Sequence, residues 1–368
     1  MAANGLAPLA AAESKRFAGE QRDLALPGAV GGSLTIHVEA GRAERSFHVT
    51  FEREGKGQYV YFDGAQWSEL IVVTRSAPFR SGVHLAIDGQ NVAHLAWVEG
   101  TGDRQGTVFY RTVRNAQAGP LEKVHAPQGW NECDIAVSST GQAVIVANTT
   151  VQPELACYER TENGWVGTKL PSDNREDKWA PSVVWADDDL LFVASRRKDR
   201  HPFTWRVRDN GQWTKDAAVP ARSYEPNGIP YGAGMIASSL DGYVYIIEKR
   251  GGEFVTAHRD VRMMKRGIIR GQHVGIGLTR AGTLVLCHSD MRHEDQKLRT
   301  ILPEHRFYYS FSRDLGKTWT LNQPVAETSG QGHGNLAANR EWVMLVWPDV
   351  RTPAGLRFSL VRDPGRAK

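Results

Sequence analysis

Short stretches of alternating apolar and polar residues run along the whole chain, separated by turns that contain glycine or aspartate. One such unit covers 84–88, turns at Gly89, and continues through 92–97, 107–111 and 121–124. Alternation over roughly four to eight positions with short turns between is typical of antiparallel β-strands. No window of about eleven residues or more keeps an apolar stripe at helical spacing. The pattern therefore predicts an all-β protein.

This unit recurs, and the turn between its first and second strands marks each copy. The turns recur about every 50 residues, at Gly41, Gly89, Gly141, Asp188, Gly242, Gly282 and Arg340. A four-stranded repeat of that length is typical of a propeller blade. We therefore predict a seven-bladed β-propeller of four-stranded antiparallel blades, and a six-bladed ring is less favoured.

The two ends of the chain complete this picture. The last unit, 335–363, lacks a fourth strand, so we expect the segment near 24–26 to supply it. Such a closure leaves no exposed sheet edge between the first and last blades. The domain prediction is thus an N-terminal extension over 1–20 and a single propeller over 21–365.

Turns closed by tryptophan form a second marker, at 63–67, 162–165, 209–213 and 312–319. The last of them, Ser312-Arg-Asp-Leu-Gly-Lys-Thr-Trp319, resembles the Asp box (Ser-x-Asp-x-Gly-x-x-Trp) of sialidase-like propellers, also called BNR repeats. In that family the box is a structural turn far from the catalytic face. The resemblance therefore implies a fold and gives these residues no chemical role.

Two further stretches resemble bacterial sialidase-like glycoside hydrolases. The segment 351–357 resembles their Arg-x-x-Pro-x-Gly-Ile-Arg motif, and 79–103 resembles the stretch from Tyr-Arg-Ile-Pro to the catalytic aspartate. The resemblance implies that Arg80 binds a substrate carboxylate and that Asp103 is the general acid. The Ile-Pro pair is missing, however, and His333 stands where sialidases carry a nucleophilic tyrosine. These departures favour a relative with different chemistry.

Function in a propeller is expected where the loops leading into the innermost strands meet the loops between second and third strands. Arginine suits this ring because its planar fork pairs with a carboxylate, and tryptophan offers a flat face to a sugar. We assign catalytic roles to Asp103, Tyr224, Glu225, His273, His288, Asp290 and His333. We assign substrate binding to Arg80, His84, Trp130, Trp179, Arg197, Tyr231, Arg270, Arg292 and Arg351. The same loops also contain Glu132, Asp134 and Asp349.

Two reactions fit such a ring, both beside an acidic sugar such as a uronate or sialate. A sialidase-like exo-glycosidase, the leading interpretation, needs carboxylates as acid and as nucleophile or base. A polysaccharide lyase instead neutralises the uronate carboxylate with Arg or His, while a Tyr or His removes the neighbouring proton for β-elimination. The residues leave hydrolase and lyase open. Tyr224, Tyr231 and the histidines are the candidate bases of the lyase.

Non-catalytic interpretations also remain. A sugar-binding lectin predicts near-identical residues in each blade, whereas stretches such as 195–203 and 248–252 differ strongly. This difference favours one asymmetric central site. Trp130 and Trp179 could instead pack between blades. The segment 287–293 could instead be a solvated polar loop. Zinc normally needs three or four converging ligands, and His288 and His293 alone do not supply them. We expect no cofactor, with a structural calcium ion left open.

Composition bounds the partners. The chain has 368 residues, 41% of them hydrophobic, and a formal charge of only +4, which is too weak to indicate bulk nucleic-acid binding. Its three cysteines are far apart, so we expect ordinary buried thiols. No apolar run approaches a membrane helix, and 1–12 does not fit a secretory signal. We expect a soluble monomer acting on acidic oligosaccharide or polysaccharide, and its compartment stays open between cytoplasm and a secreted mature form.

Overall fold

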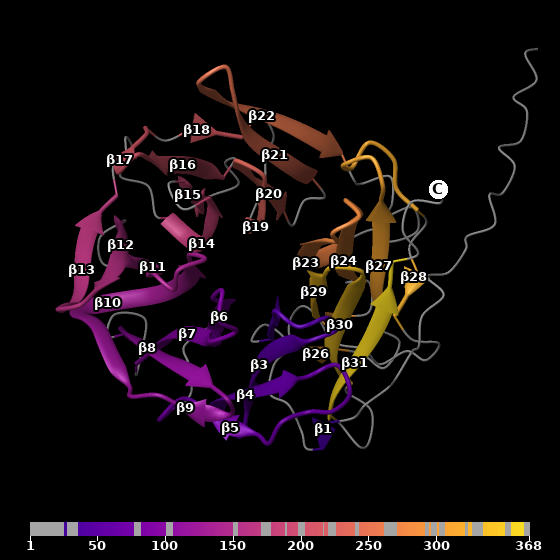
Figure 1. Ribbon diagram of the computed structural model, residues 1–368, viewed down its shortest axis with the longest axis horizontal. Coiled ribbons are helices and arrows are strands. Elements are labelled where there is room, and N and C mark those ends of the chain that lie inside the picture. Colours follow the sequence, from indigo (N-terminus) through magenta and orange to yellow (C-terminus); the bar gives the residue numbers. More distant parts are fainter. Residues whose placement is uncertain are drawn as a thin grey trace, which may run out of the picture.

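The computed structural model describes eighteen stretches of the chain, and the statements below concern these residues. They are 26–27, 36–76, 82–100, 106–149, 154–170, 178–187, 190–197, 203–215, 217–219, 226–239, 243–260, 271–290, 294–295, 300–301, 306–320, 323–325, 334–349 and 355–363. They form a seven-bladed β-propeller of mostly four-stranded antiparallel blades (Figure 1), as the repeat predicts. Within these stretches there is no helix long and apolar enough to cross a membrane.

The first four blades follow the order of the chain. Blade 1 contains β2 (His37–Ala40), β3 (Phe47–Arg53), β4 (Lys56–Phe62) and β5 (Ile71–Val72). Blade 2 contains β6 (His84–Ile87), β7 (Ala93–Glu99), β8 (Gly106–Arg114), β9 (Gln117–Ala118) and the first part of β10 (Glu122–Val137). Blade 3 contains the rest of β10, β11 (Ala143–Thr149), β12 (Glu154–Thr161) and β13 (Gly164–Lys169). Blade 4 contains β14 (Lys178–Asp187), β15 (Leu190–Arg197), β16 (Thr204–Asp209), β17 (Gln212–Trp213) and β18 (Ala217–Ala218).

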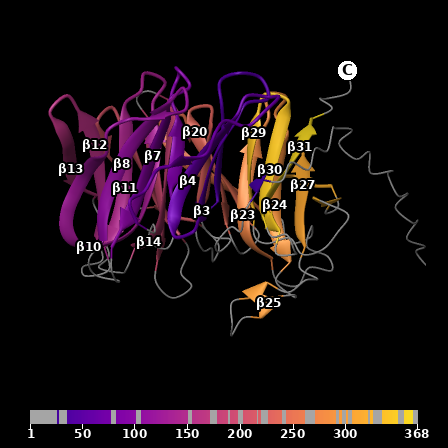
Figure 2. The ribbon, with the colours of Figure 1, turned by 90° about the horizontal axis from the view of Figure 1, so that it is seen from below.

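The remaining blades complete the ring. Blade 5 contains β19 (Asn227–Tyr231), β20 (Gly234–Ser239), β21 (Tyr243–Arg250) and β22 (Glu253–Asp260). Blade 6 contains β23 (Gly271–Leu278), β24 (Leu284–Asp290), β27 (Phe307–Ser312) and β28 (Gln323–Pro324). Blade 7 contains β29 (Asn335–Asn339), β30 (Trp342–Asp349), β31 (Gly355–Arg362) and β1 (Leu26–Pro27). A small ribbon of β25 (Glu294–Asp295) and β26 (Thr300–Ile301) lies beyond one face of the ring (Figure 2).

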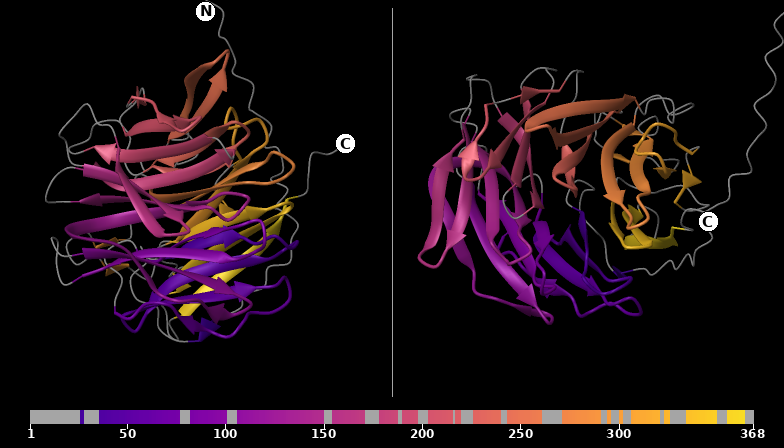
Figure 3. Two further views of the ribbon diagram at one scale, coloured as in Figure 1. Left: turned by 60° about the vertical axis from the view of Figure 1, so that its left-hand side comes forward. Right: turned by 45° about the horizontal axis from the view of Figure 1, so that its top comes forward.

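The ring is closed by the N-terminal segment, as the missing strand of the last unit predicts. Leu26 and Pro27 of β1 pair with Leu356 and Gly355 of β31, so the last blade gains its outer strand from the start of the chain. The views in Figure 3 show the last blade beside the first. The innermost strands β2, β6, β10, β14, β19, β23 and β29 contact one another in sequence around the axis, and β29 contacts β2.

The core lies between the blades. Successive residues of a strand point to opposite faces, so Val343 and Leu345 of β30 pack toward blade 6, while Met344 and Val346 pack toward blade 1. All eight residues of β30 are buried. A strand buried on both faces is apolar at most positions, which explains the long apolar runs of the second strands. Each large apolar side chain buried in this way contributes about 2 kcal/mol.

The Asp box forms the turn between β27 and β28, as its family resemblance implies. Asp314 accepts hydrogen bonds from the backbone N–H of Thr318 (2.8 Å) and from its hydroxyl (2.6 Å). Gly316 has a φ of 81°, a left-handed conformation that glycine adopts without strain. Trp319 donates to the Gly316 carbonyl and packs against the cluster between blades 5 and 6. The box is therefore structural.

Blade 5 differs from the sequence prediction. The predicted turn near Gly242 between first and second strands is wrong, because the innermost strand of this blade is β19 and its turn lies at Gly232. Both positions offer a glycine between apolar runs, so local sequence does not separate them. The contact of β19 with β14 and β23 decides which hairpin faces the axis.

Candidate functional site

The two faces of the ring are named by the innermost strands. The loop face is the one where these strands begin, and the turn face is the one where they end and turn back. Eight predicted site residues lie outside the residues that the structure describes: Arg80, Asp103, Tyr224, Glu225, Arg270, Arg292, His333 and Arg351. Their roles remain predictions.

Five more predicted residues lie at the loop face by backbone position. Trp130 is at a bulge of β10, where the strand passes from blade 2 to blade 3. Trp179 and Arg197 belong to the paired ends of β14 and β15. His273 lies near the start of β23, and Asp290, the last residue of β24, pairs with Gly271. These positions agree with the predicted face, and the roles of the side chains stay predictions.

Two predicted positions are wrong. His288 is not in a loop: it lies within β24, is 1% exposed, and its ring stacks on Tyr308 with a centroid distance of 5.9 Å. Tyr231 is not on a loop leading into blade 5, because it ends β19 at the turn to β20. There it packs against the apolar cluster between blades 5 and 6. The apolar runs around both residues extend the strands farther than their polar character suggests.

His84 lies at the loop face as predicted, and it is part of a cluster. It begins β6, and its Nδ1 lies 2.9 Å from Oδ1 of Asp134 on β10. The ring of His37, the first residue of β2, lies against it with a centroid distance of 4.0 Å. The side chains of His84 and Asp134 are 15% and 19% exposed. Three consecutive blades thus bring His37, His84 and Asp134 together beside the axis.

The far oxygen of Asp134 is also anchored. Its Oδ2 accepts the backbone N–H of Val183 in blade 4 at 2.8 Å. Two residues earlier on β10, Glu132 Oε2 accepts the N–H of Ala180 at 2.6 Å, and Ala180 has an unusual φ of 44°. Glu132 and Asp134 therefore both hold the inner strand of the next blade. The position of Asp134 is fixed from two sides.

This geometry sets the tautomer of His84. An ionised carboxylate only accepts hydrogen bonds, so Nδ1 of the paired imidazole carries the proton. In the neutral ring, Nε2 then holds a lone pair. Nε2 is buried and has no hydrogen-bond partner in the described part of the chain. A buried polar atom without a partner costs about 1–3 kcal/mol, and a catalytic role is one explanation for such an atom. The Asp134–His84 pair therefore has the arrangement of a general base with its orienting carboxylate.

Glu39 adds an acidic group on the next inward position of β2. Its side chain reaches solvent, yet the blades around it replace much of the bulk water. This desolvation, followed by the charge of Asp134, raises the pKa of Glu39 to about 8, against the lowering effects of the Ala40 N–H and of Arg42. The raised pKa favours the protonated form of Glu39, and a protonated carboxyl group can donate.

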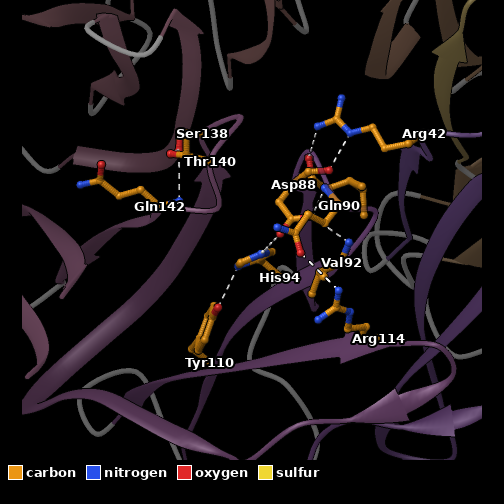
Figure 4. Close-up of polar contacts among 11 residues, drawn as sticks. Arg42, Asp88, Gln90, Val92, His94, Tyr110, Arg114, Ser138, Thr140 and Gln142 are labelled. Carbon is orange, nitrogen blue, oxygen red and sulfur yellow. Dashed lines mark hydrogen bonds and ion pairs between the residues drawn. The ribbon is translucent and has the colours of Figure 1, made fainter. Parts of the chain in front are cut away.

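A second histidine–carboxylate cluster, near the turn face of blade 2, shows the contrast (Figure 4). His94 contacts the Tyr110 hydroxyl at 2.8 Å through Nδ1 and Asp88 at 3.4 Å through Nε2. Asp88 also accepts the N–H groups of Gln90 and Val92. Burial lowers the pKa of His94, so the ring stays neutral. Both ring nitrogens have partners, so this cluster stabilises a turn.

His37 and Glu39 were not predicted from the sequence. A signal exists: His37 precedes the turn glycine Gly41 as His84 precedes Gly89, at corresponding positions of two blades.

Within the stretches that the structure describes, no three His, Cys, Asp or Glu side chains are placed to hold a metal ion. The three cysteines there are free and buried, as predicted.

No known family model and no curated protein matches the chain. Solved structures do share its fold. A polysaccharide lyase of family PL25, an ulvan lyase bound to a GlcA–Rha3S chain, superposes with a TM-score of 0.62 at 10% identity, over 94% of this chain and 97% of its own. The Hadza microbial sialidase Hz136 gives 0.50 at 10% identity, over 90% and 66%. AofleA from Arthrobotrys oligospora gives 0.51 at 10% identity, over 94% and 87%. Such identities show the propeller fold alone.

Proposed function

We propose that the protein is a polysaccharide lyase that cleaves a uronate-containing glycan by β-elimination at its loop face. The observation that carries this proposal is the Asp134–His84 pair, with a buried Nε2 that holds no hydrogen bond in the described residues. The fold similarity to a lyase bound to a glucuronate-containing chain supports the same choice. Elimination needs one oriented base, and this pair supplies it.

The reaction assigns each proton and electron pair. His84 Nε2 removes the proton on the carbon next to the uronate carboxylate. The electrons form a carbon–carbon double bond and the neighbouring C–O bond breaks; the leaving oxygen takes up a proton from solvent, to which the His84 imidazolium returns the proton that it removed. Asp134 stabilises the imidazolium ion that His84 becomes. The predicted arginines Arg80 and Arg270 would neutralise the uronate carboxylate, which acidifies the proton that leaves.

The test is an assay of acidic glycans, including ulvan, with two readouts: ultraviolet absorbance of the unsaturated uronate and release of reducing ends. The wild type should raise both. His84→Gln should lower the rate by at least about a hundredfold, the usual contribution of a general base. His94→Gln is the matched control, because it changes a buried histidine of the same blade away from the site; it should cost stability and keep the rate. A His84→Gln variant that is folded and fully active would refute the proposal.

A hydrolase is the second candidate, and the specific observation for it is Glu39. Its pKa of about 8 beside the charge of Asp134 resembles the pairing of a protonated acid with a carboxylate in glycosidases. Reducing ends released without absorbance, and lost in Glu39→Gln, would establish hydrolysis in place of elimination. Binding of the glycans with neither signal would indicate a lectin.

A further inference from the structure

Three arginines lie on the turn face, away from the proposed site. Arg280 follows β23, Arg340 follows β29 and Arg42 follows β2, so they occupy the axis-side turns of blades 6, 7 and 1. All three side chains are exposed. We call Arg42, Arg280 and Arg340 the arginine patch.

Hydrogen bonds fix the turns that carry the patch to one another. The N–H of Arg280 donates to the carbonyl of Arg340 at 2.7 Å. The side chain of Asn339 donates to three carbonyls of the blade 1 turn, including that of Gly41 at 3.0 Å. Arg42 in turn donates from Nε and Nη2 to two carbonyls of blade 2, each at 2.6 Å (Figure 4). The patch therefore stands on a rigid base.

Three acidic residues lie in or beside these turns, and one of them, Glu44, is exposed in the turn of Arg42, where its charge acts on Arg362. Glu341 forms an ion pair with Arg362 at 2.8 Å. Asp363 is buried and accepts the hydroxyl of Thr279 at 2.7 Å. In the part of the chain that the structure describes, Arg280 and Arg340 form no ion pair, and Arg42 bonds only to carbonyl and amide oxygens. Among the described residues, the three guanidinium groups of the patch therefore have no ion-pair partner.

We propose that the arginine patch is a second binding surface, which holds a polyanionic polysaccharide, sulfated or rich in uronate, on the turn face. Guanidinium groups pair with carboxylate and sulfate through two parallel hydrogen bonds. Arg280 and Arg340 can pair in this way, and Arg42, whose Nε and Nη2 already donate to carbonyls, adds positive charge beside them. Nucleic acid is the weaker partner, because a net charge of +4 gives no broad basic surface and the nearby Trp342 is only 8% exposed and covered by Arg45 and Arg362.

The test measures binding to heparin and chondroitin sulfate, with double-stranded DNA as the competitor class. It uses the His84→Gln background to suppress cleavage and reads binding directly, so the result does not depend on the proposed lyase activity. Arg280→Gln/Arg340→Gln should weaken heparin binding about tenfold at low salt. It should also reduce the slope of log Kd against log salt by about two, one for each lost contact.

The matched control is Lys215→Gln/Arg250→Gln, which removes the same net charge from exposed positions of blades 4 and 5. The control should bind heparin like the unmodified protein. Equal weakening in both variants, no weakening in either, or a preference for DNA over both glycans would overturn the proposal. Intact patch binding without any cleavage by the wild type would leave this inference standing and refute only the lyase.

Discussion

Histidines show how one residue type takes on different tasks in this molecule. His48 is 2% exposed, and its ring lies between the Tyr59 hydroxyl at 2.6 Å and Asn91 Oδ1 at 3.2 Å. Burial lowers the pKa of His48 to about 4 from its ordinary value of 6.5, with the charge of Arg42 acting in the same direction and the Asn91 bond opposing it. The side chain of His84, by contrast, is 15% exposed and lies beside a carboxylate, and its buried Nε2 has no partner among the described residues. The surroundings of each imidazole ring therefore decide whether the histidine packs in the core or can take part in a reaction.

The low pKa of His48 predicts acid sensitivity. The folded state keeps the His48 ring neutral, so the contribution of His48 to the free energy of unfolding is complete above pH 6.5. Between pH 6.5 and 4 the unfolded chain binds a proton that the folded state does not bind, and this contribution is lost. The full loss is roughly 3 kcal/mol, from about 1.4 kcal/mol per pKa unit. Urea unfolding of the wild type and of His48→Gln at several pH values checks this. The stability gap between them should shrink by that amount from pH 7 to pH 4, and a constant gap would contradict it.

The strands themselves follow from the alternation of apolar and polar residues, whereas the pairing between strands does not. Apolar runs and glycine turns predict six of the seven innermost turns, the Asp box and the closing N-terminal strand. Blade 5 is misassigned because Gly232 and Gly242 both close plausible hairpins, and only pairing across the ring selects one. The site has the same limit: His84 is predictable from its loop, whereas its partner Asp134 lies 50 residues away in sequence. Such long-range pairing is not encoded in any local pattern.

The Asp box turn should contribute to stability and not to catalysis. Asp314→Ala removes a carboxylate that binds Ser312 and Thr318, and we expect it to lower the free energy of unfolding by about 1–2 kcal/mol. The turn lies on the turn face, so glycan cleavage measured below the unfolding transition should be unchanged. Thr161→Ala is a comparison at another tryptophan-closed turn, where the hydroxyl accepts only the Asn163 N–H and donates to Gly164. A loss of activity in folded Asp314→Ala would contradict the structural role.

At the scale of the whole molecule, the ring depends on a two-residue strand. Pairing of β1 with β31 places the two ends of the propeller in one blade, so separation of the first and last blades must break this sheet. A chain without residues 1–27 should therefore have a lower melting temperature and a free edge on β31, which invites association between molecules. Calorimetry and light scattering check this against a chain that lacks only 1–20. Equal melting temperatures for the two truncations would show that β1 does not hold the ring.

Strand β10 runs through two blades, so blades 2 and 3 form a single eight-stranded sheet while the other blades are separate sheets. His84 and Asp134 both belong to this sheet. When neighbouring blades move relative to one another, a site formed by residues of two separate blades loses its geometry. Motion between blades 2 and 3 is restricted, because the continuous strand β10 belongs to both of them. Amide exchange should find this double blade opening as one unit, with the base and its carboxylate travelling together.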